Sequence, residues 1–413
     1  MSARRVVNVL WVSAVWASTA AAGDPQWPQW RGPNRDNVWP VSIHPERLPE
    51  KLRTIWRKPI GGGYGGIAIS GDRVFVMDRQ TEPREVERVV ALELATGQTI
   101  WTHEYPVRYG GLDYGNGPRA TPTVHEGRVY TLGAVGHLHC LDAATGRVVW
   151  SHDCVSEYQA TIPTWGLASS PMIDESRVVV QVGGHNGCWM AFDKRSGEVV
   201  WKALPDRAGY ASAVRIAVEG RPQLIAWTAE HVTALEPETG KLLWAVPFSI
   251  TYDVAIADPV YHDGVLLCGQ YWEGSLALRL NADGPPEKLW EGKRLRLLMA
   301  TPLVRDGCAY ALDRENGLIC VELRSGKVRW SGFKLSYDKR NPHAASWWSA
   351  DGMASFLNER GEWIVVRLSP ERVEELGRTK VFDGSWAHPG LTKDRIVVRD
   401  DREISCLTWV PPP

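Results

Sequence analysis

Aromatic, basic and acidic side chains gather just ahead of a series of short motifs in which a small or polar residue precedes proline. The motifs are Ala120-Thr-Pro, Ser169-Ser-Pro, Ala211-Ser212, Ala257-Asp-Pro, Ala300-Thr-Pro and His388-Pro. The candidate binding residues beside them are Arg119, Trp165, Tyr210, Asp253, Arg296, His343 and Trp386. Aromatic faces can stack on a ligand and guanidinium groups can pair with its carboxylates, so this set could hold a planar anion. The residue types favour a plainer interpretation over a ligand site, namely a polar, water-filled mouth in which the aromatic rings pack the loops together.

Other combinations of reactive residues give weaker indications of chemistry. His137 and His139 share one face of an expected strand next to a turn, and we interpret them as solvent-facing, so no metal site is predicted. The carboxylates of Asp113 and Asp253 are too scattered to nominate as a calcium site. The glycine-rich stretch from Gly61 to Gly66 does not open a helix, which argues against a phosphate-binding loop. The spacing of residues nominates no catalytic residue.

A repeat ending in tryptophan supplies the elements that must position these loops. Six segments such as LDAATGRVVW and FDKRSGEVVW end in tryptophans spaced 40 to 51 residues apart. A period of this length, rich in short strands, is typical of the blades of a β-propeller. Because the loops that feed the innermost strands of a propeller converge on its central channel, the candidate residues above are expected at the channel mouth.

One repeat can be divided into four strands. In the unit from Arg119 to Ser151, we expect strands at Thr121–Val124, Arg128–Leu132, His137–Asp142 and Arg147–Ser151. The turn between the last two contains Asp142, which can accept backbone N–H groups, and Gly146, which tolerates positive φ. Four sequential antiparallel strands of this kind make one blade.

The two ends of the chain indicate how the ring closes. The last unit stops after its third strand, ending at Leu407, and the segment Leu52–Ile60 resembles a fourth strand that could complete it. A degenerate unit has its third strand at Trp363–Arg367 and its fourth at Lys380–Phe382, with Phe382 near the tryptophan position. These counts predict an all-β, eight-bladed propeller, with seven blades as the alternative if the degenerate unit is an insertion.

The repeated tryptophans are expected to pack between neighbouring blades, because the same residue recurs beside the same turn. This structural set is Trp56, Trp101, Trp150, Trp201, Trp244, Trp290 and Trp330.

The N-terminus and the composition bear on location. Residues 1–22 have the basic start, apolar run and small-residue end of a signal peptide, followed by a lead-in segment at 23–51 and the propeller at 52–410. We therefore expect an exported protein, periplasmic or extracellular, with no membrane span. The formal net charge of −1 gives no indication of nucleic-acid binding. Seven cysteines without paired spacing predict few or no disulfides.

The signature A/L-x-D/E-x-x-T/S-G-x-x-x-W resembles the pyrroloquinoline-quinone (PQQ) dehydrogenase-like β-propeller family, which includes quinoprotein alcohol dehydrogenases and the outer-membrane assembly factor BamB. The resemblance runs from about Leu52 to Trp409. The segment Trp27-Pro-Gln-Trp30-Arg31-Gly-Pro-Asn34-Arg35 looks like the lead-in of exported PQQ-like repeat proteins.

The resemblance implies two functions. PQQ dehydrogenases hold Ca²⁺ with carboxylate and amide oxygens and carry adjacent cysteines beside the cofactor, and this chain has no adjacent cysteine pair. We therefore expect a non-catalytic binding or assembly platform without a cofactor, whose partner is a protein or a small ligand at the channel mouth. The alternative is a PQQ-dependent dehydrogenase, with calcium, that oxidises alcohols or sugars.

Overall fold

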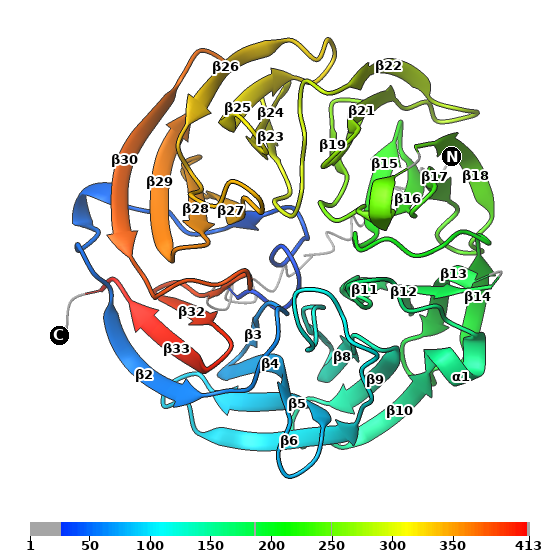
Figure 1. Cartoon of the computed structure of the whole chain (residues 1–413), viewed down its shortest axis with the longest axis vertical. Coiled ribbons are helices and arrows are strands. Elements are labelled where there is room, and N and C mark those ends of the chain that lie inside the picture. Colours follow the sequence, from blue (N-terminus) through cyan, green and yellow to red (C-terminus); the bar gives the residue numbers. More distant parts are fainter. Residues whose placement is uncertain (1–25, 186, 249, 411–413) are drawn as a thin grey trace, which may run out of the picture.

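A computed structural model describes residues 26–410 apart from 186 and 249, and it consists of eight small β-sheets arranged in a ring (Figure 1). The predicted signal peptide at 1–22 lies outside these residues. The eight sheets confirm the all-β, eight-bladed propeller and exclude the seven-bladed alternative. The short helices are η1 (Pro45–Arg47), α1 (Cys154–Tyr158) and η2 (Thr251–Asp253). Within the described residues, no helix has the length and apolar character needed to cross a membrane.

Each blade contains four antiparallel strands, the first nearest the channel and the last facing outward, and in the seventh blade a fifth strand from the start of the chain pairs in parallel with the first of these four. The first three blades are β3 (Ala68–Ser70), β4 (Arg73–Gln80), β5 (Val86–Glu93) and β6 (Thr99–Pro106); β7 (Thr123–His125), β8 (Arg128–Leu132), β9 (His137–Asp142) and β10 (Val148–Asp153); and β11 (Met172–Asp174), β12 (Arg177–Gly184), β13 (Gly187–Asp193) and β14 (Val199–Ala203). The second blade confirms the predicted four-strand division, with its first strand two residues later than expected.

The next three blades repeat the same order. They are β15 (Val214–Val218), β16 (Arg221–Trp227), β17 (His231–Leu235) and β18 (Leu242–Pro247); β19 (Val260–His262), β20 (Val265–Gln270), β21 (Gly274–Arg279) and β22 (Glu287–Gly292); and β23 (Leu303–Arg305), β24 (Cys308–Asp313), β25 (Gly317–Glu322) and β26 (Val328–Phe333). The middle strands of these sheets are buried along most of their length, and successive residues join different clusters: Leu266 and Cys268 of β20 belong to one, Val265 and Leu267 to the other. The core therefore consists of layers between facing blades.

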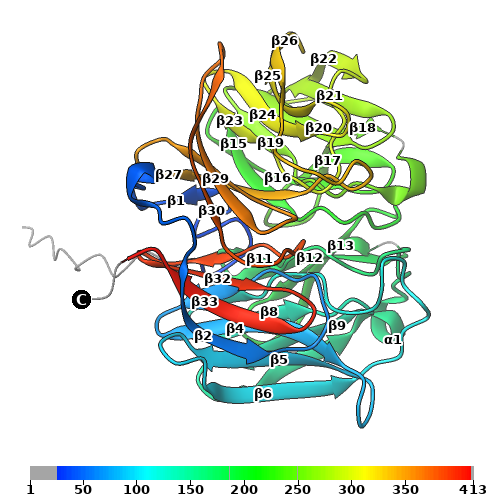
Figure 2. The ribbon, with the colours of Figure 1, turned by 60° about the vertical axis from the view of Figure 1, so that its left-hand side comes forward.

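The last two blades also use residues from the start of the chain. The seventh is β1 (Val38–Trp39) with β27 (Ala344–Ser349), β28 (Ala354–Asn358), β29 (Glu362–Leu368) and β30 (Val373–Lys380), and the eighth is β31 (Gly390–Leu391), β32 (Arg395–Arg399), β33 (Glu403–Thr408) and β2 (Arg53–Pro59). β2 pairs antiparallel with β33, which confirms the predicted closure by Leu52–Ile60. Figure 2 shows the blue lead-in crossing from β1, beside β27, to β2, beside β33.

The seventh blade corrects one detail of the sequence interpretation. Its fourth strand ends at Lys380, so Phe382 does not occupy the tryptophan position. Val365 pairs with Gly377 just before a shift in register, as Ala91 pairs with Trp101 in the first blade, so Gly377 stands where the other blades have tryptophan. Pro45 of η1 lies over Gly377, at 3.3 Å from the place where a Cβ would be. The lead-in therefore covers the gap that a missing indole leaves.

The repeated tryptophans lie between neighbouring blades, and six of the seven donate their Nε1–H to a backbone carbonyl of the next blade. Trp101 donates to Ala143 at 3.0 Å and Trp150 to Lys194 at 3.2 Å. The other four are Trp56 to Leu94, Trp201 to Pro237, Trp290 to Leu323 and Trp330 to Ser369. Each indole thus gains both a buried ring face and a hydrogen-bond partner.

Only glycine fits at the repeat's glycine position, because the tryptophan of the preceding blade packs directly against it. A Cβ on Gly97, Gly146, Gly197, Gly240 or Gly326 would lie 2.6 to 2.8 Å from that indole. These glycines also have φ between 66° and 79°, a region that L side chains rarely adopt. Trp244 is the exception, because the next blade has a longer turn, and Gln223 instead links the Trp244 indole to the Asn281 carbonyl.

All seven cysteines are buried and free, which agrees with the prediction of few or no disulfides.

The interpretation of His139 as solvent-facing is wrong, because the side chain is only 7% exposed. It packs against Tyr105 and His103 of the adjacent blade, with ring centroids 4.4 and 5.0 Å away. Burial, with the two neighbouring histidines, lowers the pKa of His139 to about 3.

Candidate functional site

A cavity of about 440 Å³ lies at the centre of one face of the ring. This volume falls in the range of pockets that hold small molecules. Aromatic residues dominate its wall, and arginines and an asparagine lie among them. The principal lining residues are Trp30, Tyr64, Asp113, Tyr114, Arg119, Trp165, Tyr210, Asp258, Tyr271, Trp272, Arg314, Arg340, Asn341, His343, Trp386 and His388.

Five of the seven candidate residues from the sequence line this cavity. They are Arg119, Trp165, Tyr210, His343 and Trp386. Asp253 and Arg296 do not line it, because each is drawn into an ion pair on the same face. Asp253 pairs with Arg207 at 2.9 Å, and Arg296 pairs with Glu315 at 2.7 Å. Ligand binding by the five lining residues remains a prediction.

Sequence reasoning missed a second group of lining residues. Tyr271 and Trp272 follow β20, and Arg314 follows β24, so all three lie in turns between the second and third strands of a blade. In a four-stranded meander these turns lie on the same face as the loops that feed the innermost strands. That topological rule could have found them, because it needs only the strand count within a blade.

The proline motifs form a belt of hydrogen bonds around the channel. The backbone N–H of Thr121 donates to the Ser170 hydroxyl at 2.9 Å, Ser170 N–H to the Ser212 hydroxyl at 3.0 Å, and Ser212 N–H to the Asp258 carboxylate at 2.8 Å. The belt continues from Asp258 N–H to the Thr301 hydroxyl at 3.1 Å, and Gly66 N–H begins it at Thr121. A hydroxyl or carboxylate at this position therefore ties each blade to the next from the first blade to the sixth.

Asp258 differs from the other members of the belt because a carboxylate has a second oxygen. That oxygen accepts the Trp30 indole N–H at 2.6 Å and lies 3.4 Å from the Arg31 guanidinium. Both Arg31 and Asp258 are buried, so the pair is shielded from solvent. The lead-in is held inside the ring (the blue loop near the centre of Figure 1), and Trp30 forms part of the cavity floor.

Two histidines face each other on the floor beside Trp30. The His388 ring lies 4.2 Å from Trp30 and 5.5 Å from His343, between centroids. Burial lowers the pKa of His343 to about 4, although a hydrogen bond to the Trp386 backbone opposes this shift. Burial, together with His343 and Arg31, holds the pKa of His388 well below its usual range. Both imidazoles are therefore neutral at pH 7.

The arginines of the wall differ in how far the protein already satisfies them. Arg119 donates to the carbonyls of Gly117 and Gly115 at 2.6 and 2.7 Å, and its guanidinium stacks over Tyr64. Burial lowers the pKa of Arg119, and the nearby phenols and Glu87 oppose this. Arg314 and Arg340 have no ion pair with any residue that the structure describes. Two guanidinium groups thus remain available to a ligand.

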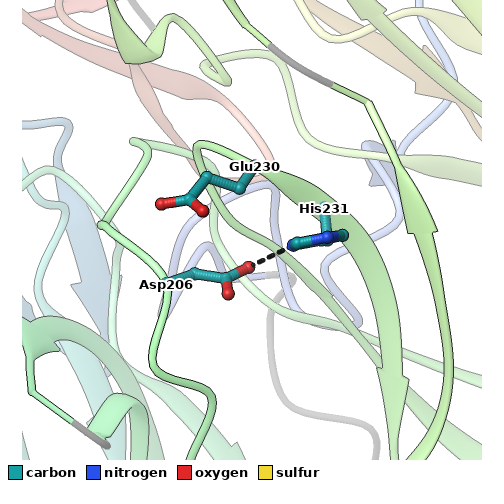
Figure 3. A group of neighbouring side chains, drawn as sticks. All are labelled: Asp206, Glu230 and His231. Carbon is teal, nitrogen blue, oxygen red and sulfur yellow. Dashed lines mark hydrogen bonds and ion pairs between the residues drawn. The ribbon is translucent and has the colours of Figure 1, made fainter.

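A separate polar cluster, Asp206, Glu230 and His231, lies at the end of the fourth blade. Figure 3 shows the Asp206 carboxylate between the other two side chains, and it accepts a hydrogen bond from His231 at 2.8 Å. Asp206 also accepts the Thr228 hydroxyl at 2.6 Å, and Arg207 pairs with Glu230. None of the three lines the cavity. Their contacts explain the cluster as an ion-pair network that joins two loops.

Calcium-bound PQQ does not fit the donor set of the cavity. Among the described residues the lining carboxylates are Asp113 and Asp258. Both oxygens of Asp258 are engaged, by Ser212 on one side and by Trp30 and Arg31 on the other. Ca²⁺ requires six to eight oxygen ligands, of which carboxylates are the main protein source. No cysteine lines the cavity either, so the lining offers aromatic faces and guanidiniums without a calcium centre.

Comparisons with known proteins agree on the architecture. A family model described as "Outer membrane protein assembly factor BamB" matches residues 85–332. A relative, the outer membrane protein assembly factor BamB of Shewanella oneidensis, is 22% identical over 247 residues. That alignment covers 55% of this chain and 58% of the relative, so the chain spans a little over half the length of this curated relative.

Two solved structures resemble the whole ring. BamB from Moraxella catarrhalis matches with a TM-score of 0.59 and 15% identity, over 86% of this chain and 97% of that one. Quinohemoprotein alcohol dehydrogenase from Comamonas testosteroni matches with a TM-score of 0.65 and 13% identity, over 94% and 82%. At these identities the likeness concerns the fold alone.

Proposed function

The chain belongs to the PQQ-like β-propeller family, and from that premise we propose that it is an exported, non-catalytic binding protein that holds a small ligand in its central cavity. One observation carries the proposal. The aromatic cavity is floored by Trp30 and contains two guanidiniums without carboxylate partners and a buried histidine nitrogen without a hydrogen bond. A buried nitrogen of this kind costs stability unless a ligand or ordered water completes its hydrogen bond.

The same lining argues against a dehydrogenase. The carboxylate on the floor is already bound by Trp30, Arg31 and Ser212, so it is poorly placed to take a proton from a substrate. Export is proposed on the basis of the N-terminal segment and the BamB relatives.

Two measurements on the purified mature protein test the proposal. The first is thermal unfolding in the presence of a broad panel of metabolites, sugars, aromatic anions and short peptides. At least one class should raise the Tm, and Trp386→Ala should abolish the rise. Tyr337→Ala, which changes a half-buried aromatic outside the cavity, should leave the rise intact. If no class of compound raises the Tm, the binding proposal is wrong.

The second measurement addresses the enzyme alternative. PQQ and Ca²⁺ are added, and binding and dye reduction with alcohols and sugars are recorded. We expect no turnover. PQQ binding at sub-micromolar concentration with substrate-dependent dye reduction would replace the binding protein with a dehydrogenase.

A second candidate function is that of an assembly platform, which the name of the matching family model favours. It makes a different demand, namely that the tagged chain co-purifies with the outer-membrane assembly complex of its own cells. In that case mutations on the blade edges should disrupt co-purification, whereas Trp386→Ala in the cavity should not.

A further inference from the structure

The aromatic residues of the cavity form one curved band around its mouth. Tyr64 and Trp386 lie 6.1 Å apart between ring centroids at an angle of 36°, and Trp386 and Tyr114 lie 5.7 Å apart at 59°. The band continues through Trp165 to Tyr210, at 58° and then 40°. None of these neighbouring rings is parallel to the next, so each presents its face in a different direction. Such a band suits a chain of puckered rings better than one flat ring system.

Two arginines that line the cavity both contact Tyr271. The Arg314 guanidinium stacks over Tyr271, 3.9 Å from the ring centroid, and the Tyr271 hydroxyl donates to the backbone carbonyl of Arg340 at 2.6 Å. Tyr271 thus touches the side chain of one arginine and the backbone of the other. Neither guanidinium is paired with a carboxylate of the described chain. A planar guanidinium binds a carboxylate through two parallel hydrogen bonds, so this pair forms a subsite for acidic groups.

The inner part of the cavity offers uncharged hydrogen-bonding groups. His343 is only 3% exposed, lines the cavity, and has an Nδ1 atom without a hydrogen-bond partner. The Trp165 indole nitrogen is also buried without a partner. A neutral imidazole nitrogen without a partner can bond one hydroxyl group in either tautomer, because a hydroxyl both donates and accepts.

From these three features we infer that the ligand is an acidic oligosaccharide, whose rings stack on the aromatic band, whose carboxylates pair with Arg314 and Arg340, and whose hydroxyls reach His343. The inference rests on the proposed binding function and specifies its ligand class. A neutral oligosaccharide would leave both guanidiniums unpaired. A flat aromatic anion would pair with them, but it would leave the curved band and the buried nitrogens unmatched.

Calorimetric titration of the mature protein with three probes tests this ligand class. The probes are trigalacturonate, maltotriose and naphthalene dicarboxylate, which represent an acidic sugar, a neutral sugar and a flat aromatic anion. We expect trigalacturonate to bind at least about tenfold more tightly than either of the others. Equal affinity for maltotriose, or tighter binding of naphthalene dicarboxylate, would overturn the inference.

Variants at the two arginines provide an independent readout. Arg314→Gln combined with Arg340→Gln should weaken trigalacturonate binding by about tenfold or more and remove the preference over maltotriose. The matched control is Arg221→Gln with Arg367→Gln, which removes the same charge from two exposed residues outside the cavity. If the control pair weakens binding as much as the cavity pair, the effect comes from overall charge and the subsite is wrong.

The outcomes separate this inference from the proposed function. If none of the three probes binds but another class in the metabolite panel raises the Tm through Trp386, the binding function stands and the acidic-sugar assignment fails. If nothing in the panel raises the Tm, both fail together.

Discussion

On the outer rim of the ring, tryptophan recurs once in most blades and in most of them meets the same surroundings, whereas each aromatic residue of the central cavity has surroundings of its own. Six of the seven rim indoles donate to a backbone carbonyl of the next blade, and five of them cover a glycine there. In the cavity, Trp30 is held by Asp258, while Trp165 and its neighbours touch one another and leave polar atoms without partners. Repetition therefore marks the part of the molecule that assembles the ring, and its absence marks the part that can recognise a ligand.

The comparison predicts losses of stability of very different size for two tryptophan truncations. Trp150→Ala should lower the free energy of unfolding by about 3–5 kcal/mol, because it removes a buried ring between two blades. Trp386→Ala should cost much less stability, because this half-buried residue lines the cavity. Urea unfolding of both variants measures the difference. Equal losses of stability would break the distinction between rim and cavity.

Among the residues of the hydrogen-bonded belt, Asp258 should contribute most to the free energy of unfolding. Asp258→Ser keeps the short side-chain oxygen that the belt uses in other blades, but it leaves the buried Arg31 without a counter-charge. We expect a loss of about 3 kcal/mol, because an unpaired buried charge is costly. Adding Arg31→Leu should recover part of the loss. Urea unfolding measures both variants, and a single variant as stable as the parent would show that Asp258 does not anchor the lead-in.

Two glycines with almost the same backbone conformation can separate strain from packing on the rim. Gly146 has φ of 73° and faces the Trp101 indole, and Gly127 has φ of 72° and faces open space. Each change to alanine should cost about 1 kcal/mol from backbone strain. Gly146→Ala should cost about 1–2 kcal/mol more, because its Cβ would meet the indole at 2.6 Å. Thermal unfolding of the pair tests this, and equal shifts in Tm would contradict a packing role for the glycine.

The effect expected only in acid concerns the layer between the first and second blades. The pKa of His139 is about 3 in the folded protein and 6.5 in the absence of perturbation. Between these values the unfolded chain binds a proton that the folded protein excludes, so stability falls as the pH drops below about 6.5. His139→Gln should flatten this dependence without changing stability much at pH 8. Urea unfolding from pH 8 to pH 4 measures it, with exposed His44→Gln as the control.

Much of the fold could be predicted from the sequence because propeller packing repeats. The tryptophan, the glycine four residues before it, and the strand at Leu52–Ile60 each reflect contacts that recur from blade to blade. The error at Phe382 arose where the repeat fails, since Gly377 takes the tryptophan position and Pro45 from the distant lead-in covers it. No pattern in the sequence around this glycine indicates that it replaces the tryptophan.

The cavity was only partly predictable for a related reason. Arg119, Trp165 and Trp386 were found because they lie near motifs that start the innermost strands. Asp253 has the same local position, yet Arg207 draws it away from the cavity. Local position along the chain thus indicates the face of the ring on which a side chain lies. Which groups that side chain contacts depends on the charged residues around it.

The amino-acid sequence by itself determined the eight blades, their strand order and the closure of the ring, because each depends on contacts that the repeat encodes in every copy. Only the tertiary structure decided that the lead-in enters the ring, that the second oxygen of Asp258 holds Trp30 and Arg31, and that Arg314 and Arg340 both contact Tyr271. These contacts join residues from different blades, in some cases more than 200 positions apart, and they occur once each. Their geometry arises only when the ring has closed.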